Sequence, residues 1–201
     1  MKVLIIVLST QKKMNNRKEY DFIPAEDRIN AGLLENKIHF LYGDIEEDNV
    51  MNTIYWITYE NLKPGNEMLT LYINSDGGSL TDAFALIEVM RKSKKPIRTI
   101  GIGSVCSAAF LIFAAGTKNE RLIAETASVM CHQYSDGFSG KYHDIKAVAK
   151  ENELANQRMV NLLKEFTGLE TRTIKSKLLP PSDVWFTTDE LLELGVADGV
   201  F

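Results

Sequence analysis

Ser107 and His132 are residue types that together catalyse acyl transfer, and each follows a run of residues typical of a strand. Ser107 lies among small side chains, where an expected strand at residues 97–102 leads into an expected helix that begins at Ala108. A hydroxyl at such a junction is accessible and lies near the positive end of the helix dipole. His132 precedes a polar loop, so its imidazole could take the proton of Ser107 and return it to a leaving amine.

Two other roles stay open for the residues of this junction. Ser104 or Ser107 could simply cap the helix, as serine often does. Cys106 could be the nucleophile instead, but if Cys106 faced His132, its neighbour Ser107 would face elsewhere. The residue types alone do not decide between these roles.

A catalytic histidine also needs a carboxylate that fixes its tautomer. Asp136, Asp183 and Asp189 all lie in or near predicted loops, and their spacing does not choose among them. The other histidines, His39 and His143, have no suggestive neighbours, so we expect them to be surface or packing residues.

A glycine turn at Asp76-Gly77-Gly78 could supply the oxyanion site. Glycine lets the backbone bend tightly and offers bare N–H groups to a developing oxyanion. The turn joins an expected strand at residues 69–73 to a helix capped by Ser79, which the strand at residues 97–102 follows. Such a right-handed unit brings both strand-to-helix junctions to the same edge of a parallel sheet. We therefore expect the glycine turn and Ser107 to face one crevice.

The remaining patterns predict a single α/β domain over residues 1–201. The further expected elements are a strand at 37–42, a helix at 51–62, a buried helix at 108–115, short strands at 122–124 and 128–132, a long helix from Asp144 to Gly168, and a last helix capped by Thr187 or Thr188. Residues 3–8 are apolar and residues 11–27 are mostly polar, so we expect residues 1–30 to be a flexible or partner-contacting segment.

Composition excludes several function classes. The net charge is -4, with no basic block to hold phosphates, so we expect no nucleic-acid partner. The chain has 2 cysteines, which is too few for a disulfide framework and fits a reducing compartment. Cys131 and His132 are neighbours on one expected strand and point to opposite faces, so we expect no metal site. No segment has the length of a membrane span.

Four separated segments resemble the ClpP family, the proteolytic subunits of Clp proteases, and they occur in the family's order. They are residues 73–79 (INSDGGS), 103–107 (GSVCS), 129–133 (VMCHQ) and 190–198 (ELLELGVAD). The resemblance runs in register from about residue 37 to the carboxyl terminus. It implies that Ser107 is the nucleophile, His132 the general base and acid, and Asp183 the orienting carboxylate. It also implies that the backbone N–H groups of Gly77 and Ala108 form the oxyanion hole.

The resemblance further implies a fold, an assembly and partners. The fold is the ClpP/crotonase-like spiral of βαβ units, in which the long helix after His132 protrudes as a handle. The implied function is a serine endopeptidase that hydrolyses peptides and unfolded proteins inside two stacked seven-membered rings in the cytoplasm or an organelle stroma or matrix. A separate ATP-driven AAA+ unfoldase of the Clp type would feed these rings. No cofactor is expected in this chain, since no glycine-rich segment has the spacing of a nucleotide site.

Two departures from the family pattern leave other functions to weigh. Asp76 stands where the family usually has proline, and Ala108-Ala109 stand where it usually has Met-Gly. They motivate one alternative, a catalytically weak ring subunit that co-assembles with an active paralogue. A second alternative is a crotonase-type acyl-CoA enzyme, because those enzymes share a related spiral and a backbone oxyanion hole.

Overall fold

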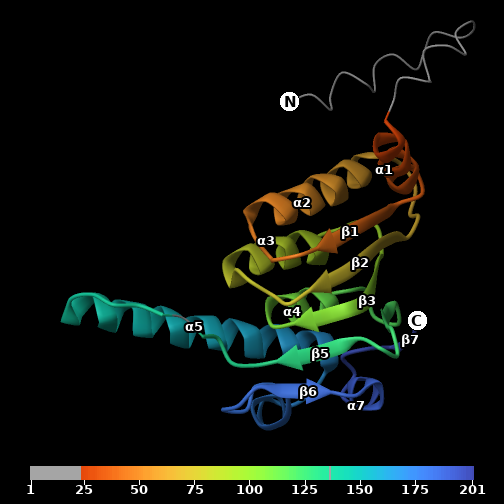
Figure 1. Ribbon diagram of the computed structural model, residues 1–201. Coiled ribbons are helices and arrows are strands. Elements are labelled where there is room, and N and C mark those ends of the chain that lie inside the picture. Colours follow the sequence, from red (N-terminus) through yellow and green to blue (C-terminus); the bar gives the residue numbers. More distant parts are fainter. Residues whose placement is uncertain (1–23, 136) are drawn as a thin grey trace, which may run out of the picture. The chain divides into compact units, whose positions relative to one another are not determined.

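The computed structural model describes residues 24–135 and 137–201 (Figure 1). It divides into two units at Asn36. The described part of the first unit is helix α1 (Ala25–Glu35), which has acidic residues in its first turn and buries none of its side chains. This helix was not predicted, because its apolar residues are too few to form a clear stripe. The predicted flexible segment otherwise lies outside the described residues.

The second unit, residues 37–201, contains a mostly parallel sheet, which confirms the predicted α/β class. Five parallel strands follow the order β1 (Ile38–Tyr42), β2 (Leu69–Ser75), β3 (Ile97–Cys106), β4 (Arg121–Ile123) and β7 (Gly199–Val200). The carboxyl-terminal part of β3 instead pairs with β5 (Ser128–Cys131), and β6 (Val184–Phe186) pairs with β5 in the antiparallel sense. One long strand, β3, therefore links two branches of the sheet.

β3 is longer than predicted, since it continues to Cys106 rather than ending at residue 102. The register shifts along β2 and β3, from the pair Ile73 with Gly101 to the pair Ser75 with Val105. Gly103 has φ 61° within this bulge, a backbone conformation that favours glycine. Beyond the bulge, β3 pairs with β5 instead of β4 and continues to Cys106, the residue before Ser107.

The helices of the second unit are placed by apolar packing. Helix α2 (Glu47–Leu62) packs against α3 (Leu80–Arg91), and α3 packs against α4 (Ala108–Ala114). All residues of α4 are buried, as its apolar sequence predicted. Because the core surrounds α4 on all sides, the amino-terminal end of this helix is held firmly in the protein.

Helix α5 (Tyr142–Thr167) begins two residues before the predicted start and ends at Gly168, which has φ 76°. Its buried residues all lie in its carboxyl-terminal half, from Ala155 onward. In Figure 1 the amino-terminal half extends well beyond the sheet of its unit. The long helix therefore has one anchored half and one projecting half.

The carboxyl-terminal segment follows α5 through α6 (Thr171–Thr173) and the π-helical turn η4 (Ile174–Leu178). After Pro180 and Pro181 it enters β6 and then α7 (Thr188–Glu193), which Thr187 caps through Glu190. None of the helices within the described ranges is both long and apolar enough to cross a membrane.

Candidate active site

Ser107 occupies the junction of β3 and α4 in a backbone conformation that is rare for a residue with a side chain. Its φ and ψ are 55° and -119°, outside the regions that most residues adopt. Its N–H donates to the carbonyl oxygen of Met130 at 3.0 Å, so the neighbouring strand β5 holds the junction in place. Strain of this kind persists only where the surroundings enforce it, and it is concentrated at functional sites.

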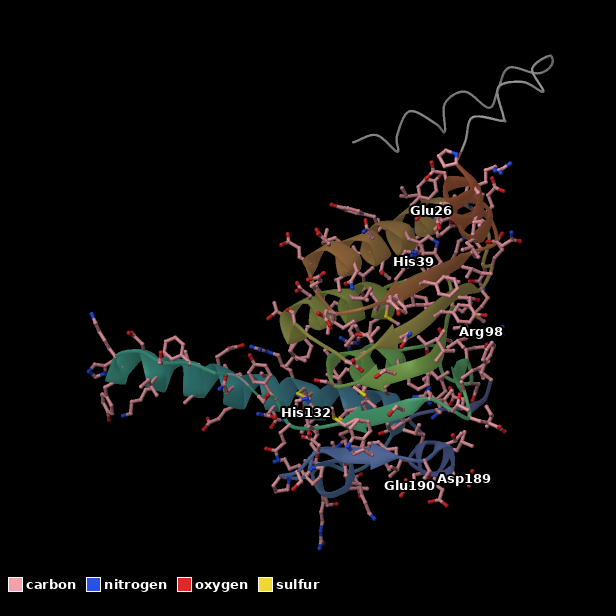
Figure 2. The ribbon with its side chains drawn as sticks, in the orientation of Figure 1. Glu26, His39, Arg98, His132, Asp189 and Glu190 are labelled. Atoms are coloured by element: carbon pink, nitrogen blue, oxygen red, sulfur yellow. The ribbon has the colours of Figure 1, made fainter. Side chains whose placement is uncertain are left out.

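The hydroxyl of Ser107 makes no capping hydrogen bond to α4. Ser107 Oγ instead lies 2.7 Å from His132 Nε2. His132 is half-buried and directly follows β5, the strand that pairs with the carboxyl-terminal part of β3 (Figure 2). A hydroxyl within hydrogen-bond reach of an imidazole is the arrangement that activates a serine nucleophile. The structure thus brings together the first two residues of the predicted site.

Gly77 lies against Ser107 from the other side. It has φ 109°, and a Cβ on it would come within 2.7 Å of Ser107 Cβ and 2.9 Å of the carbonyl oxygen of Cys106. Its N–H donates to Ser75 Oγ at 3.1 Å. Ala108 is the first residue of α4, so its N–H has no acceptor within the helix. The glycine turn and the nucleophile junction therefore face each other, as the crossover rule predicted.

A cavity of about 200 Å³ opens beside the Ser107–His132 pair. Its lining combines backbone and small groups with apolar side chains from α3 and α5: Gly78, Leu80, Ser107, Ala108, His132, Gln133, Tyr134, Ser135 and Met159. The loop after His132 is tied to α5 through Tyr134, whose N–H donates to Asn156 Oδ1 at 3.0 Å. This cavity borders the Ser107 hydroxyl, and polar and apolar groups both line it.

Asp183, the third predicted residue, is exposed and makes no hydrogen bond to His132. Its position is nevertheless adjacent, because Cys131 pairs with Val184 in the antiparallel ladder of β5 and β6. One more step of that register would set His132 opposite Asp183, and directly opposite residues have Cβ atoms about 5 Å apart. Asp189 is exposed at the start of α7, and Asp136 lies outside the described residues.

The cysteine thiols, His39 and His143 are not hydrogen-bonded to the side chains of Ser107 or His132 in the described part of the chain. The buried Cys106 thiol donates to the carbonyl oxygen of Ser128 at 3.7 Å, not to His132. Burial raises the pKa of the Cys131 thiol to about 12. His39 stacks on Trp56, and His143 is exposed on α5. Among the described residues, no three His, Cys, Asp or Glu side chains are grouped to hold a metal ion.

Sequence reasoning missed the hydrogen bonds by which Asn74 and Asp76 tie the glycine turn to β3. Asn74 Oδ1 accepts a hydrogen bond from the N–H of Ser104 at 2.9 Å, and Asp76 Oδ1 accepts one from Ser104 Oγ. Only a departure from the family motif, Asp76 in place of proline, marked one of these residues in the sequence.

Comparison with known proteins identifies the family of the chain. A family model described as Clp protease matches residues 24–201. The chain belongs to the Clp protease family. It is also similar to the ATP-dependent Clp protease proteolytic subunit 2 of Thermobifida fusca, with 28% identity over 184 residues, covering 92% of this chain and 90% of that protein. The mostly parallel sheet with its flanking helices is consistent with the fold of this family, and a peptidase of the Clp type follows from membership. Neither comparison favours the acyl-CoA or weak-subunit alternatives.

Proposed function

We propose that this Clp-family peptidase is a serine endopeptidase that works through an acyl-enzyme. Ser107 Oγ attacks the scissile carbonyl carbon while His132 Nε2 takes the hydroxyl proton. The C–N bond then breaks as His132 gives that proton to the leaving amine, and water hydrolyses the ester by the same steps in reverse. The observation that carries the proposal is the 2.7 Å contact between Ser107 Oγ and His132 Nε2 at the edge of a cavity.

The oxyanion would bind to the backbone N–H groups of Gly77 and Ala108. Both residues adjoin Ser107, and a Cβ added to Gly77 would come within 3.2 Å of the backbone nitrogen of Ala108. The N–H of Gly77 would have to be shared between Ser75 Oγ and the oxyanion, because Ser75 already accepts it. One such donor lowers the barrier by about 3 kcal/mol.

Asp183 would orient His132 in the working enzyme. The antiparallel register of β5 and β6 supports this role, since it continues toward a pairing of residues 132 and 183. Asp183 is exposed, and its carboxylate would have to turn toward Nδ1 of the imidazole to take this role.

The expected assembly is two stacked seven-membered rings that enclose the active sites and receive unfolded protein from an ATP-driven unfoldase. The projecting half of α5 supports contact between copies, because most of its surface is free within its own unit. An aromatic cluster supports unfoldase docking: Phe40 stacks on Tyr72 at 4.8 Å, and Phe201 meets Tyr72 edge-on at 5.9 Å. Phe40 and Phe201 are both exposed.

A fluorophosphonate probe tests the serine mechanism. It should label the native protein at Ser107 and stop hydrolysis of a fluorogenic peptide, whereas Ser107→Ala should show neither labelling nor hydrolysis. Ser176→Ala, which removes an exposed hydroxyl from η4, is the matched control and should behave as the native protein does. Labelling or hydrolysis that persists in Ser107→Ala would refute the proposal. The mass of the native particle tests the double ring in the same preparations.

A further inference from the structure

A pair of side chains, Asp76 and Ser104, connects the glycine turn to the strand that carries the nucleophile. Ser104 Oγ donates to Asp76 Oδ1, and Ser104 lies in the last part of β3, three positions before Ser107. The N–H of Ser104 donates to Asn74 Oδ1 at 2.9 Å. One residue of β3 is thus held by two side chains from the end of β2 and the turn that follows.

Successive side chains of an extended segment point in alternate directions, so Ser75 makes different contacts from its neighbours Asn74 and Asp76. Asn74 and Asp76 reach across to Ser104, while Ser75 is buried and accepts the N–H of Gly77. The turn is therefore fixed at two points, to β3 through Asp76 and internally through Ser75. Gly77 lies between these points and Ser107, where even a methyl group would not fit.

We propose that Asp76 is a positioning residue for the oxyanion site, acting through Ser104. This inference rests on the proposed function, because it concerns the N–H of Gly77 as an oxyanion donor. The hydrogen bond from Ser104 fixes the position of the turn relative to β3. The distance from Gly77 to Ser107 therefore stays constant while the substrate reacts. Preorganised donors are effective because they need no reorganisation during the reaction.

The hydrogen bond and the charge of Asp76 should have opposite effects on kcat. A carboxylate next to an oxyanion donor repels the negative charge that develops in the transition state, whereas its bond to Ser104 places the donor. An asparagine keeps an oxygen acceptor for Ser104 and removes the charge. Asp76→Asn and Asp76→Ala therefore separate the two effects.

The test measures steady-state hydrolysis of a small peptide for Asp76→Ala, Ser104→Ala, their double variant and Asp76→Asn. Each alanine variant should lose roughly tenfold in kcat, less than the complete loss of a donor, with KM within about twofold. The double variant should resemble Asp76→Ala, since removing the Ser104 hydroxyl as well takes away no further bond to Asp76. Asp76→Asn should keep or exceed the native kcat. The matched control is Ser128→Ala, which removes an exposed hydroxyl from the β5 residue paired with Ser104.

Native kcat in both alanine variants, additive losses in the double variant, or an equal loss in Asp76→Asn would each overturn the inference. Amide hydrogen exchange at residues 76–79 gives a readout that needs no catalysis. Exchange there should be faster in Asp76→Ala and Ser104→Ala but not in Asp76→Asn, and unchanged exchange would also overturn the inference. If the native protein is not labelled by the fluorophosphonate, the proposed function fails instead. The exchange data then still decide whether the hydrogen bond between Asp76 and Ser104 holds the glycine turn in place.

Discussion

The two sides of the candidate site are built very differently. Ser107 lies between β3 and α4, and every residue of α4 is buried. Asp183 precedes the short strand β6, which pairs only with β5 among the described strands and carries the exposed Trp185. Core packing within one chain therefore sets the positions of Ser107, Gly77 and His132, whereas Asp183 is exposed next to a strand that pairs on one side only among the described strands.

The largest effect is expected on the exposed side. If Asp183 has the orienting role proposed above, Asp183→Ala should lower kcat about 1,000- to 10,000-fold, because the imidazole would lose the carboxylate that holds its tautomer. The same change should alter the free energy of unfolding by no more than about 0.5 kcal/mol, since the side chain is exposed. Peptide hydrolysis and urea unfolding measure the two effects. Asp189→Ala is the matched control, and a comparable loss of activity there, with Asp183→Ala active, would transfer the orienting role to Asp189.

A second contrast concerns stability on the two sides. Phe110 in α4 is 0% exposed and stacks on Phe186 with ring centroids 5.8 Å apart. Phe110→Ala should lower the free energy of unfolding by about 3–5 kcal/mol, because a buried ring leaves a cavity. Trp185→Ala in β6 should change it by only about 0.5 kcal/mol, since this ring is 61% exposed. Urea unfolding compares them, and a similar cost at Trp185 would show that β6 is packed as firmly as α4.

Gly77→Ala tests the close approach on the buried side. The added Cβ would come within 2.7 Å of Ser107 Cβ, and φ 109° is unfavourable for alanine. We expect kcat to fall about 100- to 1,000-fold, the effect of losing one oxyanion donor. Gly32→Ala in α1 is the matched control, because a Cβ there meets nothing within 4 Å. Native kcat in Gly77→Ala would show that the turn can move away from Ser107 without harm to the reaction.

The sequence predicted the buried side of the site well, and physical reasons explain what it left out. Small residues around Ser107 and the crossover rule were enough to set Gly77 opposite the serine. The length of β3 was missed, because a bulge at Gly103 depends on contacts from Asn74, which lies far away in the chain. The choice of Asp183 came from family resemblance, since side-chain directions at an exposed strand end are not encoded in local periodicity.

The smallest effect on catalysis is expected at His39 in β1, a strand that does not pair with β3. Burial lowers the pKa of His39 from 6.5 to about 4. Its Nε2 lies 3.1 Å from Thr53 Oγ1, and that hydroxyl donates its own proton to the carbonyl oxygen of Asn49. Thr53 Oγ1 therefore accepts from His39, so the proton of the neutral imidazole is assigned to Nε2 and Nδ1 is unprotonated. Protonation would therefore place a charge on a ring that is stacked against Trp56.

Linkage then fixes the direction of the pH effect. Above pH 6.5 both the folded and unfolded chains hold His39 neutral, so its contribution to stability is complete. As the pH falls from 6.5 to about 4, the unfolded chain binds a proton that the folded chain does not, and the free energy of unfolding decreases. His39→Phe keeps a ring against Trp56 and should flatten this part of the profile, whereas His143→Phe on α5 should not. Urea unfolding at a series of pH values measures how the free energy of unfolding changes with pH. An equal change in His39→Phe and in the native protein would show that other groups cause the pH dependence.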